Sequence, residues 1–193
     1  HFPIWHKEIR DIIVLKNNKG TEDNRVRKLD YSIQLSKLFY ERFITNQKIT
    51  LFSPHDVPGL YDSFGTESFD ELYTRYESDE SIPKTSIDAQ ELILDILKER
   101  AETGRLYLMN MDHCNSHSSF LDKVNMSNLC QEITLPTKPL KHIDDPDGEI
   151  ALCILSAINV GKINRLDELE DLCDLSVRGL EELIDYQGYP VKA

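Results

Sequence analysis

Residues 126–132 place an amide, a thiol and a carboxyl group at every second position of the chain. These groups belong to Asn128, Cys130 and Glu132. In an extended strand, alternate side chains point to the same face, and neighbouring members of this trio lie roughly 6.6 Å apart. A thiol next to a candidate base and an amide donor can act on one small polar molecule. The trio therefore predicts a reactive site on one face of a strand.

The residues after the trio favour this extended conformation. Residues 133–135 read Ile-Thr-Leu, and each is β-branched or apolar. A helix would separate the three groups, because only residues three and four apart are neighbours on its surface. Taken alone, Cys130 is also compatible with an inert core position, because buried cysteines usually act as small hydrophobic residues. Its polar same-face neighbours, Asn128 and Glu132, argue against a core face.

The two polar members of the trio have different chemical uses. Glu132 could be a surface residue of an alternating strand, whereas burial in a pocket would disfavour its charged form and make it a stronger base. Asn128 carries both a donor and an acceptor, which suits it to hold a hydroxyl group or to orient the carboxylate. Both residues are therefore candidates for substrate contact.

The other cysteines carry weaker signals. Cys153 lies in an apolar run, which favours an inert buried thiol, and Cys173 falls on the apolar face of a predicted helix. Cys114 lies next to His113 and close to His117, which invites a metal hypothesis. A zinc site would need a second ligand pair at compatible spacing, and the sequence has none. We therefore predict a polar loop here and no metal site.

The bulk composition is that of a globular domain. The chain has 193 residues, of which 40% are hydrophobic and 29% charged, and its net charge of −12 argues against non-specific binding to nucleic acid. No run approaches the roughly 20 apolar residues of a membrane span. The four cysteines show no CxxC spacing, which favours a reducing, cytoplasmic compartment. Because the chain starts at His1 without a signal or transit peptide, we expect an internal part of a larger protein.

The predicted elements alternate between helices and strands. The periodicity predicts helices at residues 3–16, 86–103 and 166–184, a strand followed by a helix at 31–43, strands at 49–52, 105–109, 128–135 and 150–158, a loop at 112–125 and a turn at 144–148. Gly104 is a predicted helix C-cap. The apolar run at 150–158 is typical of a strand buried on both faces. The alternation indicates an α/β protein with a partly parallel sheet, as a barrel or an open sheet.

Several short motifs follow one another in a recognisable order along almost the whole chain. The central ones are Ser127–Glu132, Leu135–Pro139 and Gly148–Cys153. Others are Val14–Asn18, Asn24–Arg27, Leu51–Pro54, Asp56–Asp62, Asp112–Asn115 and Asp185–Pro190. In these motifs and their order, the chain resembles the large, catalytic subunit of class I ribonucleotide reductases.

The resemblance implies a fold and a place within it. The family fold is a ten-stranded α/β barrel made of two five-stranded halves, with the active cysteine on a finger loop inside. Residues 1–193 would form the central segment of this catalytic barrel domain, including the finger-loop cysteine. The N-terminal effector regions and the C-terminal part would lie outside the chain.

The resemblance also implies roles for residues of the central motif. Cys130 would become the transient thiyl radical that removes the ribose 3′ hydrogen. Glu132 would take the proton of the 3′ hydroxyl, and Asn128 would hydrogen-bond the substrate and Glu132. Together with Leu129 and Gln131, these residues would form the substrate-binding segment.

A second cysteine gains a role by the same resemblance. Cys153 would be one of two thiols that reduce the 2′ position and end as a redox-active disulfide, and its partner is absent from the chain. This role replaces the inert thiol that the apolar run favours. Cys114 and Cys173 match no catalytic position of the family, and Tyr186 and Tyr189 do not match its radical-transferring tyrosine pair.

The complete enzyme implied by the resemblance is an allosteric oxidoreductase that makes deoxyribonucleotides. It would use ribonucleoside diphosphates, nucleotide effectors, the rest of the large subunit, a small radical-generating subunit with a metal cofactor, and thioredoxin or glutaredoxin. We expect no cofactor to be bound by this segment directly and no partnership with nucleic acid or membrane. The segment alone is expected to be inactive without the missing parts.

The residues themselves leave two other function classes open. Cys130 with Glu132 could serve a cysteine-nucleophile hydrolase or transferase, with His113 or His117 as nominal partners. An activated nucleophile is alkylated quickly near neutral pH, whereas a radical-relay thiol need not be. The chain could also be a non-catalytic partner-binding fragment, which would bind the other pieces but supply no essential residue.

Overall fold

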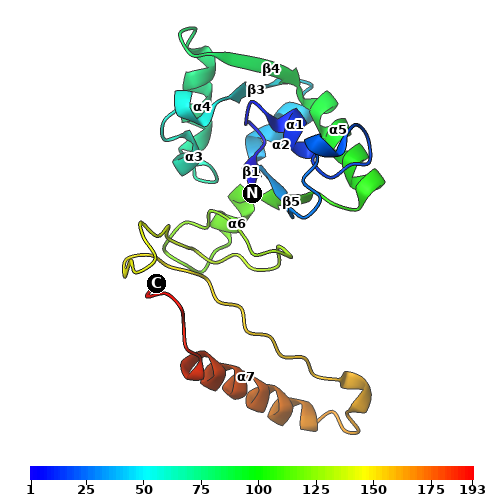
Figure 1. The fold of residues 1–193 in the computed structure, drawn as a ribbon, viewed down its shortest axis with the longest axis vertical. Coiled ribbons are helices and arrows are strands. Elements are labelled where there is room, and N and C mark those ends of the chain that lie inside the picture. The colour runs from blue at the N-terminus through cyan, green and yellow to red at the C-terminus, as the bar shows by residue number, and fades with distance from the viewer. The chain divides into compact units, whose positions relative to one another are not determined.

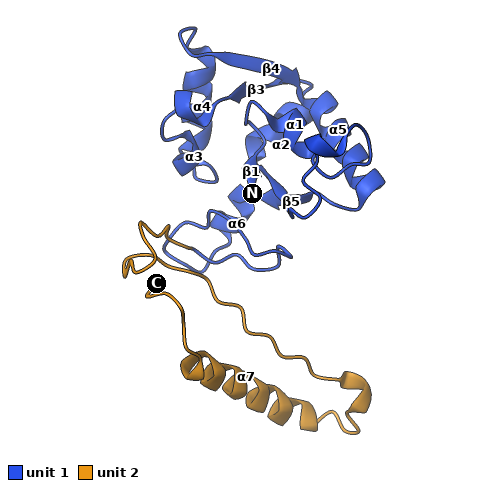
Figure 2. Cartoon of the chain, viewed as in Figure 1, with its two compact units in different colours: residues 1–136 blue, residues 137–193 orange.

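A computed structural model describes all 193 residues and divides them into two compact units, residues 1–136 and 137–193 (Figure 2). Most regular elements belong to the first unit (Figure 1). They are β1 (Phe2–Pro3), α1 (Ile9–Ile13), β2 (Ser32–Leu35), α2 (Lys37–Ile44), β3 (Lys48–Phe52), α3 (Leu60–Ser63), α4 (Phe69–Ser78), β4 (Lys84–Asp88), α5 (Ala89–Thr103), β5 (Tyr107–Asn110) and α6 (Met111–Ser116). The second unit contains α7 (Glu168–Tyr186).

Parallel strands form the central sheet of the first unit. Its order is β1-β2-β5, and the register pairs Ile33 with Phe2 on one side and with Leu108 on the other. The strands β3 and β4 form a separate antiparallel pair. The prediction of an α/β protein with a partly parallel sheet is confirmed, and the strands of this segment do not close into a barrel.

The central strand β2 directs apolar side chains to one face of the sheet and polar side chains to the other, here called the polar face. All four of its residues are buried. Ile33 and Leu35 belong to a core cluster that includes residues of α1, α2 and α5. Because side chains alternate along a strand, Ser32 and Gln34 occupy the opposite face. The helices α1, α2 and α5 therefore cover one face of the sheet, whereas Met109, the register partner of Gln34, packs in a second core cluster with residues of α3, α4 and α6.

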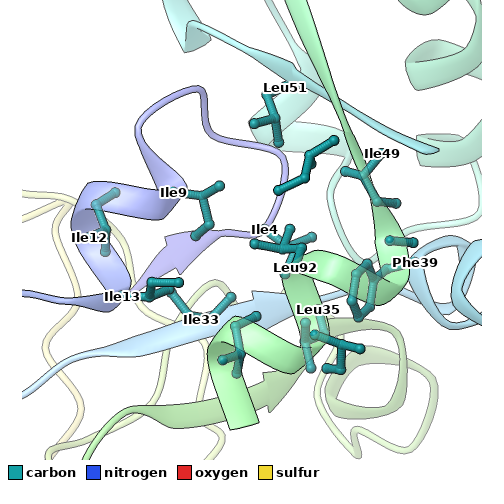
Figure 3. Close-up of a cluster of buried hydrophobic side chains, with 14 of the residues drawn as sticks. Ile4, Ile9, Ile12, Ile13, Ile33, Leu35, Phe39, Ile49, Leu51 and Leu92 are labelled. Carbon is teal, nitrogen blue, oxygen red and sulfur yellow. The ribbon is translucent and has the colours of Figure 1, made fainter. Parts of the chain in front are cut away.

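The core cluster against the helices is aliphatic, apart from Phe39 of α2 and Tyr31 (Figure 3). Leu92 of α5, Ile9 of α1 and Ile33 of β2 are fully buried within it. Each fully buried side chain of this kind contributes roughly 1.5–3 kcal/mol of hydrophobic free energy. This packing fixes the helices against the sheet and makes the sheet a rigid base for whatever lies on its polar face.

The helix α5 has a cap at each end. Its N-cap Asp88 accepts hydrogen bonds from the backbone N–H groups of Gln90 and Glu91. At the other end, Gly104 adopts a left-handed conformation with φ of 65°, which confirms the predicted C-cap. The predicted start at residue 86 is wrong, because residues 84–88 pair with β3 as a strand.

Two other boundary predictions in the first unit are only partly correct. Residues 2–3 form a strand beside β2, so the predicted N-terminal helix is limited to Ile9–Ile13. The predicted loop at 112–125 begins with the helix α6 at Met111–Ser116. Residues 2–3 form a strand because they pair with β2. The helix α6 begins directly after the last residue of β5.

A partly buried ion pair links α2 to α4. Both guanidinium NH groups of Arg42 donate to the carboxylate of Glu77 at 2.6 Å, and Thr50 donates to the same carboxylate at 2.5 Å. Burial acts to raise the pKa of Glu77, but the hydrogen bonds from Arg42 and Thr50 outweigh it and hold the pKa below its ordinary value. Tyr73 packs beneath Arg42, with the guanidinium carbon 5.0 Å from its ring centroid.

We expect Arg42→Met to lower the free energy of unfolding of the first unit by about 3 kcal/mol, because it leaves a partly buried carboxylate unpaired. The measurement is urea unfolding followed by the fluorescence of Trp5, the only tryptophan of the chain. Lys37→Met, which removes an exposed i,i+4 pair with Glu41, is the matched control and should cost less than about 0.5 kcal/mol. Equal losses of unfolding free energy in the two variants would contradict the expectation that the Arg42–Glu77 pair stabilises the unit more than an exposed pair does.

The second unit differs most from the sequence-based expectation. The helix α7 is present as predicted, but residues 150–158 form no strand, and Cys153 and Cys173 are both exposed. The expectations of a strand buried on both faces and of a core position for Cys173 are therefore wrong for this segment. A strand buried on both faces needs a neighbouring strand on each side, and the second unit has only the single bridge between Lys138 and Glu149.

Candidate active site at the Cys130 turn

The predicted trio lies in a turn, here called the Cys130 turn and defined as residues 127–133. The backbone N–H of Gln131 donates to the carbonyl of Asn128 at 3.2 Å, and Gln131 adopts a left-handed conformation with φ of 63°. The side-chain oxygen of Asn128 accepts from the N–H of Ile133 at 3.1 Å and from the hydroxyl of Ser127 at 3.2 Å.

The predicted strand at 128–135 is therefore wrong. No neighbouring strand pairs with this segment, so its backbone groups bond within the turn instead. The alternation that would place Asn128, Cys130 and Glu132 on one face is lost at Gln131. The three groups remain within five residues of one another, but the geometry that brings them together is that of a loop.

Side chains anchor this turn to the polar face of the sheet. The amide of Gln131 donates to the carbonyl of Leu108 in β5 at 2.5 Å. The imidazole of His1 lies between the sheet and the turn, 2.5 Å from the Ser32 hydroxyl and 2.9 Å from the Ser127 carbonyl. The turn consequently lies on the face of the sheet opposite α1, α2 and α5.

A small cavity lies between the turn and the sheet. Its volume is about 220 Å³. It is lined by His1, Asp30, Tyr31, Ser32, Tyr107, Ser127, Asn128, Leu129 and Gln131. This volume is below the roughly 300–1,000 Å³ of typical small-molecule sites, so a nucleotide would need further walls.

The two residues expected to do chemistry do not line this cavity. Cys130 and Glu132 are exposed, whereas Asn128 and Gln131 are partly buried. The structure therefore brings Asn128, Leu129 and Gln131 together around the cavity and leaves the thiol and the carboxylate on the open side of the turn. Of the two alternatives for Glu132, a surface position and burial in a pocket, this segment shows the surface position.

Burial perturbs the pKa of Tyr31, which lines the cavity, and of Cys114 on α6. Burial raises the pKa of Tyr31 to about 12, and the Glu99 carboxylate adds to the effect, so this cavity residue stays a neutral hydroxyl at physiological pH. Burial also raises the pKa of the Cys114 thiol above its ordinary value. A thiol that stays protonated near neutral pH is a poor nucleophile, so Cys114 lacks the features of a reactive cysteine.

The remaining candidate residues form no site of their own in this structure. Cys153 belongs to the second unit, where it is exposed in a segment without regular structure. His113 and His117 contact each other edge to face, with ring centroids 6.1 Å apart. No group of three or more His, Cys, Asp or Glu side chains in the chain is arranged to hold a metal ion. The chain also contains no helix long and apolar enough to cross a membrane.

Sequence reasoning missed the residues that support the turn from the sheet. Gln34 of β2 is fully buried, and its amide nitrogen donates to the carbonyl of Asn125 at 2.6 Å, two residues before the turn begins. Ser32 and His1 support it from the same face. The detectable signal was the polar Gln34 between the apolar Ile33 and Leu35 of a strand, because buried glutamines require hydrogen-bond partners.

Comparison with known proteins reveals extensive similarity. A family model described as "Ribonucleotide reductase, barrel domain" matches residues 1–193. The subunit alpha of ribonucleoside-diphosphate reductase from Haemophilus influenzae is 57% identical over 100% of this chain and 26% of its own length. The subunit from Buchnera aphidicola subsp. Schizaphis graminum is 56% identical over 98% of this chain and 26% of its own length.

Another relative shows the same similarity over a shorter stretch. Ribonucleoside-diphosphate reductase 1 subunit alpha of Escherichia coli (strain K12) is 55% identical over 72% of this chain and 19% of its own length. The chain thus spans about a quarter of the length of the curated relatives that match it throughout.

Proposed function

Because this chain belongs to the ribonucleotide reductase barrel-domain family, we propose that it is the central catalytic segment of a ribonucleoside-diphosphate reductase large subunit. In the complete subunit it would take part in reducing ribonucleoside diphosphates to deoxyribonucleoside diphosphates. The observation that carries the proposal is the Cys130 turn, which is anchored to the sheet face opposite α1, α2 and α5. In a closed α/β barrel with outer helices, that face is the interior.

Within this proposal, Cys130 carries the thiyl radical that removes the 3′ hydrogen of the ribose. Glu132 accepts the proton of the 3′ hydroxyl, and Asn128 orients both the substrate and Glu132. A radical must be shielded from solvent, which a barrel interior provides. A base two residues from the radical acts on the hydroxyl of the carbon being attacked, so both steps are positioned together.

The hydrogen-bond pattern of Asn128 supports its assigned role. Its side-chain oxygen accepts two hydrogen bonds within the turn, from Ser127 and Ile133. Its amide nitrogen, which has two N–H donors, remains for contacts with a hydroxyl or a carboxylate. Asn128 can therefore hold the turn and bind a substrate oxygen at the same time.

The second unit would supply one of the two reducing thiols of the proposed reaction. Cys153 would reduce the 2′ position together with a cysteine from elsewhere in the subunit, and the pair would end as a disulfide. Thioredoxin or glutaredoxin would then restore the thiols, and a small subunit with a metal cofactor would generate the radical. These thiol reactions suit a reducing, cytoplasmic compartment.

Exposed apolar side chains of the second unit support a larger assembly. Leu152 and Leu155 are exposed in the apolar segment, and Leu172, Leu175 and Leu183 are exposed on α7. Monomeric proteins rarely leave apolar surface of this extent uncovered. We infer that the remaining parts of the barrel cover these residues and supply the missing strands beside 150–158.

The proposal is tested by complementation. The chain is mixed with polypeptides that supply the upstream and downstream parts of the subunit, together with small subunit and reductant, and deoxyribonucleotide formation is assayed. Activity that requires this chain supports the proposal. A complex that demonstrably assembles with this chain but forms no product would favour the non-catalytic, partner-binding alternative.

A further inference from the structure

Gln34 is a polar residue in the middle strand of the parallel sheet. It is fully buried in β2, between the apolar residues Ile33 and Leu35. Burying an amide without hydrogen bonds is unfavourable, so a glutamine at this position requires a specific partner. The identity of that partner indicates what the residue does.

The partner of Gln34 is the backbone of the segment that leads into the Cys130 turn. Its side-chain nitrogen donates to the carbonyl oxygen of Asn125 at 2.6 Å. A carbonyl oxygen only accepts hydrogen bonds, so the NH₂ group must face Asn125 and the side-chain oxygen must point away. That oxygen is buried and accepts no hydrogen bond. Gln34 therefore directs its amide nitrogen to the segment before the turn, and the same side chain also forms a hydrogen bond with Tyr61 of α3.

The segment before the turn is fixed from a second direction as well. The side chain of Asn115 pairs with the backbone of Val124, accepting from its N–H at 2.9 Å and donating to its carbonyl at 3.1 Å. Asn115 belongs to α6 and Gln34 to β2, so two elements hold adjacent residues. Because residues 124–133 have no strand partner, these side-chain bonds replace the backbone ladder that would otherwise set their position.

We propose that Gln34 is a positioning residue that sets the distance between the Cys130 turn and the polar face of the sheet. The inference rests on the proposed function, because loss of the Gln34 contact matters for catalysis only if the displaced Cys130 thiol is the reacting group. Hydrogen transfer requires the reacting atoms to approach within about 3–3.5 Å, and a displacement of about 1 Å can cost about 100-fold in rate. Gln34 contacts neither substrate nor thiol and acts through the backbone of Asn125.

The test uses the complete subunit with the variant Gln34→Met, which keeps the length of the side chain but lacks the donor. We expect kcat for ribonucleoside diphosphate reduction to fall about 10- to 100-fold, while the substrate Kd stays within about two-fold. Amide hydrogen exchange at residues 124–131 should accelerate, while exchange in α5 stays at the wild-type rate.

The matched control is Gln90→Met on α5. Gln90 is exposed, and its side-chain nitrogen also donates to a backbone carbonyl, that of Phe43 at 3.4 Å. This control should keep the wild-type kcat and the wild-type exchange at residues 124–131. Gln34→Leu is a second variant, judged by the same criteria if Gln34→Met folds poorly.

A folded Gln34 variant with wild-type kcat overturns the inference. An equal loss of kcat in the Gln90 variant, or faster exchange throughout the subunit, also overturns it, because either result indicates a general loss of stability. If the wild-type subunit itself forms no deoxyribonucleotide, the proposed function fails. The exchange measurement then decides separately whether Gln34 anchors residues 124–131.

Discussion

Replacing Cys130 by serine in the complete subunit is expected to lower kcat for ribonucleoside diphosphate reduction by at least about 1,000-fold, or ~4 kcal/mol in the barrier. The substitution keeps the size of the side chain and a hydrogen-bond donor. It replaces a weak S–H bond by a much stronger O–H bond, so the radical that removes the 3′ hydrogen cannot form at comparable cost. Substrate binding should change little. The measurement is a steady-state assay combined with a direct determination of substrate Kd.

Cys173→Ser is the matched control for this experiment. Cys173 lies on α7, is exposed in this segment, and matches no catalytic position of the family. The control should keep kcat within about two-fold of wild type, since a residue outside the site contributes nothing to transition-state binding. A Cys130→Ser enzyme that keeps a tenth or more of the wild-type rate would remove the radical role from Cys130.

The sequence predicted the long elements well because their signals are local. The helix α5 carries its apolar stripe, its N-cap Asp88 and its C-cap Gly104 within a continuous stretch. The strand β3 is a short run of β-branched and apolar residues followed directly by a turn signal, and all of it except Lys48 is buried. In each case the residues that determine the structure lie within a few positions of one another, so periodicity and capping rules suffice.

The structure of the Cys130 turn depends on residues that are distant in the sequence. His1 and Ser127 are separated by 126 positions, and Gln34 and Asn125 by 91. No local pattern predicts such contacts, and the β-branched residues after the turn favoured a strand. The turn forms because side chains from the sheet satisfy its backbone and no strand is available for pairing. The sequence motif placed Asn128, Cys130 and Glu132 close together, but it predicted a strand where the structure has a turn.

The apolar segment at 150–158 was mispredicted for a related reason. Its composition matches a strand buried on both faces, but a strand exists only where neighbours supply hydrogen bonds and cover the side chains. This segment has no strand partner within the 193 residues, and most of its side chains are exposed. The sequence therefore carries information about an environment that other parts of the complete barrel would have to provide.

The second large effect is expected for Glu132→Gln in the complete subunit, which should lower kcat by about 100- to 10,000-fold. Glutamine keeps the shape of the side chain but cannot accept the proton of the 3′ hydroxyl. Because a neutral amide can still hydrogen-bond that hydroxyl, substrate Kd should stay within about ten-fold of wild type. Glu181→Gln, at an exposed position of α7, is the control and should leave kcat unchanged.

The same variant separates radical chemistry from nucleophilic chemistry at Cys130. If Glu132 activates a nucleophilic thiol, its removal should slow the alkylation of Cys130 near neutral pH along with the catalytic rate. If Glu132 serves the substrate hydroxyl, kcat falls while the alkylation rate stays unchanged. Parallel losses would favour the hydrolase or transferase alternative over the reductase. We expect the two rates to diverge, because the structure shows no hydrogen bond between the Cys130 thiol and the Glu132 carboxylate and leaves both groups exposed on the open side of the turn.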